Sequence, residues 1–304
     1  ARGWRLGLDP NHRFSLDKMA LRTFCRNAEL DLCVQSLWDC LDTDRDGAVC
    51  MQDVTPKGAL ALASLRSWSH QKCGSCVAVW DLPALAQSRF QPREKLTSMK
   101  KMLTECFMEA VKVEGWPGSA KDRSWKGQAQ LCSALDKFHA GMVSKEDLAW
   151  LDSWEPPLFL LEEASEEAWN ELFGQLLSKY GSPLKAWFHL DMDNTNEVSW
   201  SELVAACKKI KFKGNLGAAW RYIDDDASGV ISLKEFSSPD FELLMSFKEW
   251  ASSHFGSVGN AFKNFDKDGS GSLTLGELRR ACQRRKWVGE AKMLFDCLGS
   301  SPDK

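Results

Sequence analysis

Apolar residues recur at helical spacing along most of the chain. Leu216, Trp220 and Ile223 fall on one helical face before an acidic segment, and Leu203 and Cys207 share a face after another. Such stripes indicate amphipathic helices that bury one face in a core. Most of the fourteen Trp residues also fall on predicted helices. The pattern therefore predicts an all-α protein whose Trp residues belong mainly to the core.

The acidic segments between the predicted helices repeat at fixed spacing. Segments that open at Asp191 and Asp266 have an apolar residue seven positions later and a glutamate eleven positions later. Intervals of 33 residues separate consecutive openings, from Asp9 to Asp42, from Asp191 to Asp224 and from Asp266 to Gly299. Equal intervals predict a repeating unit, here a pair of helix–loop–helix motifs. A fourth pair is expected between the helix around Met99–Val113 and a loop that opens at Asp136.

These segments resemble the loops of the EF-hand superfamily, to which calmodulin belongs. A twelve-residue loop of that family holds calcium through oxygen atoms at positions 1, 3, 5, 7, 9 and 12. Position 6 needs a positive backbone φ, which favours Gly and, less well, Asn. Position 8 is apolar and pairs with its counterpart in a partner loop. The resemblance covers most of the chain and implies tandem EF-hand pairs, joined by short strand ladders, in two lobes or a curved array.

Four loops carry the ligand pattern of the family, and the resemblance implies their calcium ligands. The Asp266 loop offers Asp266, Asp268, Ser270, the Ser272 carbonyl, Thr274 and Glu277. The Asp224 loop offers Asp224, Asp226, Ser228, the Val230 carbonyl, Ser232 and Glu235. The Asp191 loop offers Asp191, Asp193, Thr195, the Glu197 carbonyl, Ser199 and Glu202. The Asp42 loop offers Asp42, Asp44, Asp46, the Ala48 carbonyl and Asp53.

Two of these loops depart from the pattern. Asn196 replaces Gly at position 6 of the Asp191 loop, which Asn tolerates better than most residues. Asp53 closes the Asp42 loop and is one methylene shorter than Glu, so that loop is expected to accept Mg²⁺ as well as Ca²⁺. Cys50 at its position 9 is a poor ligand for a hard cation, so a water is expected there.

Three further segments keep the repeat but lack essential ligands, and we expect them to fold without metal. The unsuitable residues are Arg13, Phe14 and Ala20 in the Asp9 loop, Phe138 and Ala140 in the Asp136 loop, and Gly299 in the last segment.

The repeat divides the chain into four predicted parts. They are an N-terminal EF-hand pair at 1–70, a degenerate EF-hand-like region at 71–155, a pair at 165–240 and a pair with a truncated second loop at 241–304. Because Pro stops helices and stiffens linkers, the stretch Trp154–Pro157 is the expected joint, with the changeover at residues 152–165.

Composition narrows the class of partner. The 39 basic and 42 acidic residues leave a net charge of −3, which argues against a nucleic-acid partner. No apolar run approaches the roughly 18 residues of a membrane span. The eleven scattered cysteines are typical of small buried hydrophobes rather than a disulfide framework, so a reducing, cytoplasmic location is expected. A start without Met or a signal-peptide core suggests a piece of a longer protein.

Two weaker motifs also have simpler interpretations. His70, Cys73 and Cys76 could contribute to a zinc site or a redox pair, but no second ligand pair is evident nearby in the sequence. Ordinary loop cysteines are the favoured interpretation. The basic segments Lys208–Lys213 and Arg279–Trp287 could contact a membrane surface or an acidic partner, yet positive charge also suits the end of a helix. A solvated face is favoured for both.

The function predicted is that of a calcium sensor, not an enzyme, because the five His residues are dispersed and form no catalytic cluster in the sequence. In sensors of this family, calcium reorients paired helices and exposes an apolar groove for a target helix. Two alternatives remain open. The chain could be the EF-hand regulatory segment of a larger enzyme or channel, or a scaffold that calcium staples with little helix movement.

Overall fold

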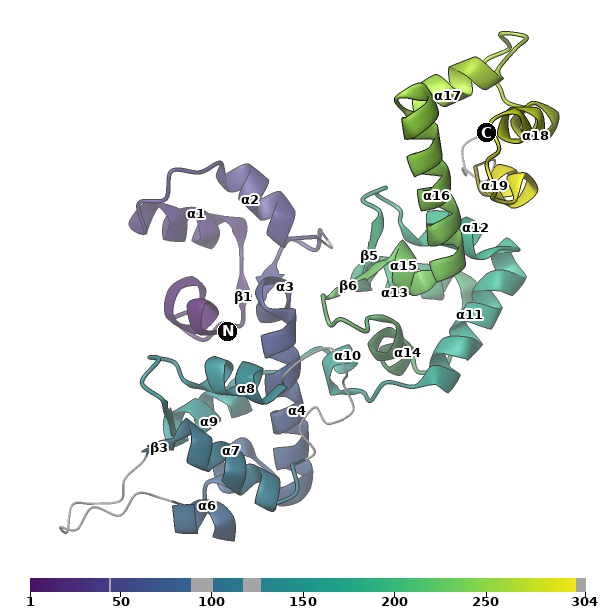
Figure 1. Cartoon of the computed structure of the whole chain (residues 1–304). Helices are drawn as coiled ribbons and strands as arrows, with labels where there is room; N and C mark the ends of the chain where they lie inside the picture. The colour runs from purple at the N-terminus through teal and green to yellow at the C-terminus, as the bar shows by residue number, and fades with distance from the viewer. Residues whose placement is uncertain (44, 89–100, 117–126, 299–304) are drawn as a thin grey trace, which may run out of the picture. The chain divides into compact units, whose positions relative to one another are not determined.

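The computed structural model describes residues 1–43, 45–88, 101–116 and 127–298 and is mostly helical, with a few short strands (Figure 1). Three residues named in the predictions above, Asp44, Met99 and Gly299, lie outside the described residues. Within the described part of the chain, no helix is long and apolar enough to cross a membrane.

The chain divides into two compact units that do not follow sequence order. Unit 1 comprises 1–168 and 215–229, and unit 2 comprises 169–214 and 230–304. The segment 215–229 thus belongs with the N-terminal half, although it lies between two parts of unit 2. The four parts expected from the repeat stay a prediction.

Unit 1 contains a π-helical turn, short strands and many helices. In chain order these are η1 (Trp4–Leu8), β1 (Ser15–Leu16), α1 (Lys18–Asn27), α2 (Val34–Leu41), β2 (Val49–Cys50), α3 (Met51–Val54), α4 (Pro56–Cys73), α5 (Cys76–Val79), α6 (Pro83–Ser88), β3 (Lys101–Leu103), α7 (Thr104–Val113), α8 (Gly127–Leu135), β4 (Met142–Ser144), α9 (Lys145–Ser153), α10 (Leu158–Leu161) and α14 (Leu216–Ile223).

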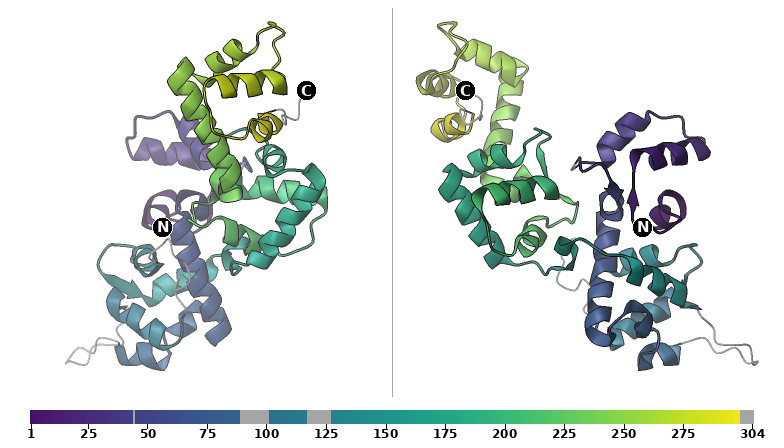
Figure 2. Two further views of the ribbon diagram at one scale, coloured as in Figure 1. Left: turned by 45° about the vertical axis from the view of Figure 1, so that its right-hand side comes forward. Right: turned by 180° about the vertical axis from the view of Figure 1, so that it is seen from behind.

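The central element of unit 1 is the long helix α4, against which the shorter α8 packs (Figures 1 and 2). Its first half, Gly58–Leu65, is rich in Ala and Leu and is almost entirely buried, because α3, α5, α8 and α10 all pack against α4. Pro56 suits the first turn, where its missing N–H removes no helical hydrogen bond. Gly74 ends the helix at φ +85°, a left-handed conformation that residues with a side chain rarely adopt.

Unit 2 holds the remaining elements and most of α11. They are α11 (Glu166–Tyr180), α12 (Pro183–Leu190), β5 (Glu197–Ser199), α13 (Trp200–Ile210), β6 (Val230–Ser232), α15 (Leu233–Phe236), α16 (Ser238–Phe255), α17 (Val258–Phe265), α18 (Leu275–Arg284) and α19 (Ala291–Leu298). Phe236 contacts the rings of Trp169, Phe173 and Trp187, which together form one aromatic centre of this unit.

Among the described residues, three antiparallel ladders join loops that lie apart in the sequence: β1 with β2, β3 with β4, and β5 with β6. Each ladder has one buried apolar pair at its middle or end, and these pairs are Leu16 with Val49, Met102 with Val143, and Val198 with Ile231. Every member of the three pairs is at most 4 % exposed. The ladders therefore bury apolar surface between loops whether or not the loops hold metal.

Candidate metal centres

The first aspartate of each acidic loop ends the helix that enters it. Asp191, Asp224 and Asp266 follow α12, α14 and α17, and the backbone N–H of each still donates to a carbonyl of that helix. Their side chains fold back over the loop and accept hydrogen bonds from backbone N–H groups four and five residues later. The N–H donors are Thr195 (2.9 Å) and Asn196 (3.1 Å), Ser228 (2.9 Å) and Gly229 (3.2 Å), and Ser270 (3.1 Å) and Gly271 (2.9 Å).

The turn at position 6 has the positive φ that the sequence predicts. Gly47, Gly229 and Gly271 have φ of +84°, +88° and +77°, and Asn196 has φ of +66°. In this conformation the N–H groups of Asn196, Gly229 and Gly271 donate to the first aspartate of their loops. The backbone therefore curls around the carboxylates and leaves their remaining lone pairs directed into the loop.

The closing glutamate of each loop is held at the start of the next helix. Glu202, Glu235 and Glu277 are the third residues of α13, α15 and α18, and each forms a reciprocal capping box with the Ser or Thr at position 9. In the Asp266 loop, Glu277 Oε2 accepts from the Thr274 N–H (3.0 Å) and hydroxyl (2.7 Å), and Oε1 accepts from the Lys267 N–H (3.3 Å). One carboxylate thus joins the two ends of the loop.

These two features bring three carboxylates together in each of three loops. The groups are Asp191, Asp193 and Glu202; Asp224, Asp226 and Glu235; and Asp266, Asp268 and Glu277. Within each group, one oxygen from every carboxylate lies within 4.8 Å of the others. Oxygens on opposite sides of one calcium ion are about 5 Å apart, so the spacing fits a single ion. The chain passes from unit 1 to unit 2 inside the Asp224 loop, and this group is a local feature of its twelve residues.

The neutral ligands expected at positions 5 and 7 lie side by side in the Asp191 and Asp266 loops. The Thr195 hydroxyl donates to the Glu197 carbonyl (3.0 Å), and the Ser270 hydroxyl donates to the Ser272 carbonyl (3.0 Å). Positions 5 and 7 are therefore adjacent in both loops. An ion placed between the carboxylates would meet these oxygens as well, which completes a donor set made wholly of oxygen, as calcium prefers.

The electrostatics of the carboxylates favour a divalent cation. Burial raises the pKa of Asp191, and the neighbouring charges of Glu202 and Asp193 raise it further, against the lowering effect of its N–H donors. The Thr274 hydroxyl and N–H lower the pKa of Glu277, and the Ser270 hydroxyl and N–H lower that of Asp268. A bound cation would relieve the repulsion among these carboxylates.

The Asp42 loop is described except for Asp44. Asp42 is 7 % exposed, and its Oδ1 atom has no hydrogen-bond partner among the described residues. The Ala48 N–H donates to Asp46 (2.8 Å), and the Cys50 N–H donates to Asp53 (2.6 Å). A buried carboxylate oxygen without a partner is costly, so a cation at this position would stabilise the loop.

Two loops without the ligand pattern keep the same backbone. Asp9 accepts from the N–H groups of Arg13 (2.8 Å) and Phe14 (2.7 Å), and Phe14 has φ of +61° at position 6. Asp136 accepts from the N–H groups of Ala140 and Gly141, both at 2.9 Å. The hydrogen bonds of the first aspartate therefore recur in loops whose other ligand positions are unsuitable for a metal ion.

Asp147, at position 12 of the Asp136 loop, forms an ion pair with Arg5 that no pattern in the sequence predicts. Arg5 is 2 % exposed, and its Nη2 atom lies 2.6 Å from Asp147 Oδ1. Its Nη1 atom donates to the Leu135 carbonyl (2.9 Å) at the end of α8, and the guanidinium lies 4.1 Å from the centre of the Trp150 ring. A guanidinium thus balances Asp147, the carboxylate at position 12 of the Asp136 loop.

Comparison with known families assigns one segment. A family model described as EF-hand domain matches residues 258–288, which comprise α17, the Asp266 loop and α18. No curated protein matches the chain. The match supports EF-hand membership and suggests calcium binding, in agreement with the acidic groups that could hold a metal ion.

Proposed function

We propose that this protein is a calcium sensor built from paired EF-hands, with calcium ligands in the Asp42, Asp191, Asp224 and Asp266 loops. The observation that carries the proposal is the same convergence of three carboxylates in three loops, one of which lies in the matched segment. The ligand atoms that these three groups offer are all carboxylate oxygens, which favours a hard cation over a transition metal.

The helices around the Asp266 loop supply an apolar surface that calcium could open. Phe247, Phe265 and Leu278 are buried among α16, α17 and α18, and many partly buried apolar side chains surround them. The partly buried aromatic residues are Trp250, Phe255, Phe262, Trp287 and Phe295. Because Glu277 belongs to the first turn of α18, its ligation would move that helix relative to α17. Such a movement would uncover the aromatic surface for an apolar target helix.

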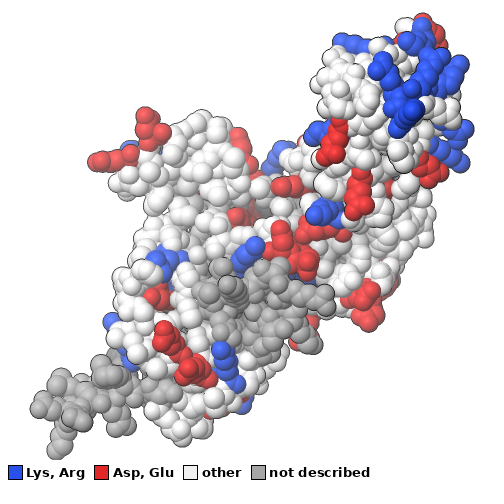
Figure 3. All heavy atoms as spheres, in the orientation of Figure 1, with Lys and Arg blue, Asp and Glu red and all other residues white. Residues whose placement is uncertain are grey.

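Charge next to this surface indicates the character of the target. Lys and Arg side chains gather over the C-terminal helices (Figure 3). They include the exposed Arg279, Arg280 and Arg284 of α18, and Arg285, which follows this helix. The Arg285 guanidinium lies 5.1 Å from the centre of the Phe255 ring. A target helix with an apolar face flanked by acidic residues would match both features.

A calcium-stapled scaffold is the second candidate. Hydrogen bonds within the loops fix the side chains of Asp191, Asp224 and Asp266. A ladder with a buried apolar pair joins the Asp191 loop to the Asp224 loop. Calcium that binds a loop of this kind could stabilise it with little helix movement. The two candidates differ in whether ion binding alters the surroundings of Trp250 and Trp287.

Titration of calcium into the metal-free protein, in about millimolar Mg²⁺, tests both candidates through heat and Trp emission. A sensor should bind in the range of about 10⁻⁷ to 10⁻⁵ M and change its emission. Trp287→Phe should reduce the emission change, because Trp287 contacts Phe247 and Trp250 beside the moving helices. Trp154→Phe, in unit 1, is the matched control. Binding without an emission change would favour the scaffold, and an absence of calcium-dependent heat would refute both.

Asp53→Glu should raise the calcium affinity of the Asp42 loop about tenfold, because the longer side chain can reach the ion with both oxygens. Asp31→Glu, at an exposed position before α2, should leave the affinity unchanged. Competition between Ca²⁺ and Mg²⁺, followed by calorimetry, measures the change. An unchanged calcium affinity in Asp53→Glu would show that Asp53 does not limit calcium coordination.

A further inference from the structure

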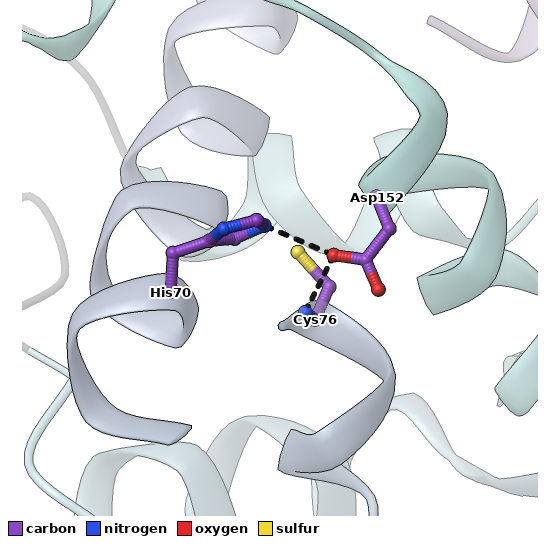
Figure 4. Close-up of side chains that lie close together, drawn as sticks. All are labelled: His70, Cys76 and Asp152. Atoms are coloured by element: carbon purple, nitrogen blue, oxygen red, sulfur yellow. Dashed lines mark hydrogen bonds and ion pairs between the residues drawn. The ribbon is translucent and has the colours of Figure 1, made fainter. Parts of the chain in front are cut away.

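A second kind of metal-binding chemistry lies in unit 1, away from the acidic loops. His70 belongs to the last turn of α4, Cys76 is the first residue of α5, and Asp152 lies at the end of α9 (Figure 4). One possible ligand atom from each residue lies within 4.8 Å of the other two. The sequence offered His70, Cys73 and Cys76 as a weak motif and favoured ordinary loop cysteines, whereas the fold brings Asp152 to His70 and Cys76.

Asp152 is fixed in position by the start of α5. Its Oδ1 accepts from the Cys76 N–H (2.7 Å), its Oδ2 accepts from the Val77 N–H (2.9 Å), and His70 Nε2 lies 3.0 Å from Oδ1. Burial alone would raise the pKa of Asp152, but the hydrogen bonds from Cys76 and Val77 outweigh it and lower the pKa. These hydrogen bonds hold the carboxylate beside His70 and Cys76.

The surroundings of Cys76 argue against a nucleophile. Its side chain is fully buried, and burial, followed by the charge of Asp152, raises the pKa of its thiol far above the ordinary value. A thiol held in its protonated form is a poor nucleophile, because the thiolate is the reactive species. A metal cation reverses this preference, since a coordinating thiol loses its proton outright.

We propose that His70, Cys76 and Asp152 bind a zinc ion that ties the end of α9 to the junction of α4 and α5. Imidazole nitrogen, thiolate sulfur and carboxylate oxygen are all ordinary zinc ligands, whereas calcium disfavours the first two. Ligand atoms around tetrahedral zinc are about 3.5 Å apart, so modest side-chain rotations close the present spacing. The ion replaces the contact between His70 Nε2 and Asp152, and Nε2 becomes its nitrogen ligand.

The surroundings provide access and a fourth ligand. The side chains of His70 and Asp152 are 38 % and 23 % exposed, so the ion can enter from their side and water can complete the tetrahedron. Cys73 takes no part, because its thiol points to the Ser69 and Ser75 carbonyls at 3.2 and 3.5 Å. The zinc site is independent of the calcium loops, whose ligands are all oxygen.

Cobalt substitution in the full chain tests the proposal. With the calcium loops saturated and thiols kept reduced, Co²⁺ should bind with a stoichiometry of one per chain. It should give a thiolate-to-metal charge-transfer band and the intense ligand-field bands of a tetrahedral site, and Zn²⁺ should displace it. Cys76→Ser should abolish the charge-transfer band. Cys106→Ser, at a half-buried position of the same unit, should retain it.

His70→Gln guards against a folding artefact, because His70 is exposed and its loss should not unfold the unit. This variant should keep the native circular dichroism spectrum and bind cobalt at least about tenfold more weakly. Loss of a residue that only hydrogen-bonds to a metal ligand already lowers metal affinity by about that factor. The absence of a charge-transfer band in the parent protein would overturn the proposal. A band that persists in Cys76→Ser, or an unchanged affinity in His70→Gln, would do the same.

Discussion

Replacement of Glu277 by Gln should weaken calcium binding at the Asp266 loop by about a hundredfold, or about 2.7 kcal/mol. The amide removes the negative charge of the side chain. It also leaves one oxygen in place of the two that can coordinate the ion bidentately. It has nearly the same shape as the carboxylate and can still accept the hydrogen bond from the Thr274 N–H. The loop should therefore keep its fold, and the loss should report coordination alone.

Calorimetry of the calcium titration measures this effect as the loss of one binding step from the parent isotherm. Glu249→Gln is the matched control, because Glu249 lies on the exposed side of the neighbouring α16. If α18 moves when Glu277 binds calcium, the emission change of Trp287 should disappear together with the binding step. An unchanged isotherm in Glu277→Gln would remove the Asp266 loop from the set of calcium sites.

The acidic loops could be predicted from the sequence because all their determinants are local. The first aspartate, the turn residue and the closing glutamate of the Asp266 loop lie within twelve residues, and their spacing alone sets the geometry. The same holds for the capping box between Thr274 and Glu277. The apolar residue at position 8 also predicts the buried pair of one ladder, Val198 with Ile231.

Contacts between distant segments could not be predicted in this way. Asp152 lies 82 residues from His70, and no spacing rule links a helix end to a His that precedes it by so much. The membership of 215–229 in unit 1 is likewise set by packing, since α14 lies against α10. Sequence periodicity identifies the apolar face of α14 but not the helix that covers it.

Arg5 is the clearest contact of this long-range kind, because 142 residues separate it from Asp147. In the sequence, Asp147 is the acidic residue at position 12 of a loop with Phe138 and Ala140 at two ligand positions. A buried carboxylate without a metal would be costly there. The turn η1 carries Arg5 into contact with it, and the guanidinium also occupies the Leu135 carbonyl at the end of α8.

Arg5→Met should lower the free energy of unfolding of unit 1 by about 3–5 kcal/mol, because it leaves Asp147 buried without its counter-charge. Methionine keeps an apolar chain against Trp150, so lost packing contributes little. Urea denaturation of the metal-free protein, followed by Trp emission, measures the loss. Arg13→Met, at an exposed position of the Asp9 loop, should change stability by no more than about 0.5 kcal/mol.

The double variant Arg5→Met/Asp147→Asn separates the charge effect from general damage. Asn removes the uncompensated charge but can still accept the hydrogen bond from the Ser144 N–H that caps α9. It should therefore recover part of the stability lost in Arg5→Met, and calcium should recover none of it, because the loop lacks ligands at positions 3 and 5. Strictly additive losses would show that the ion pair is not what stabilises this loop. Recovery by the double variant alone would show that Arg5 neutralises the closing carboxylate of this loop.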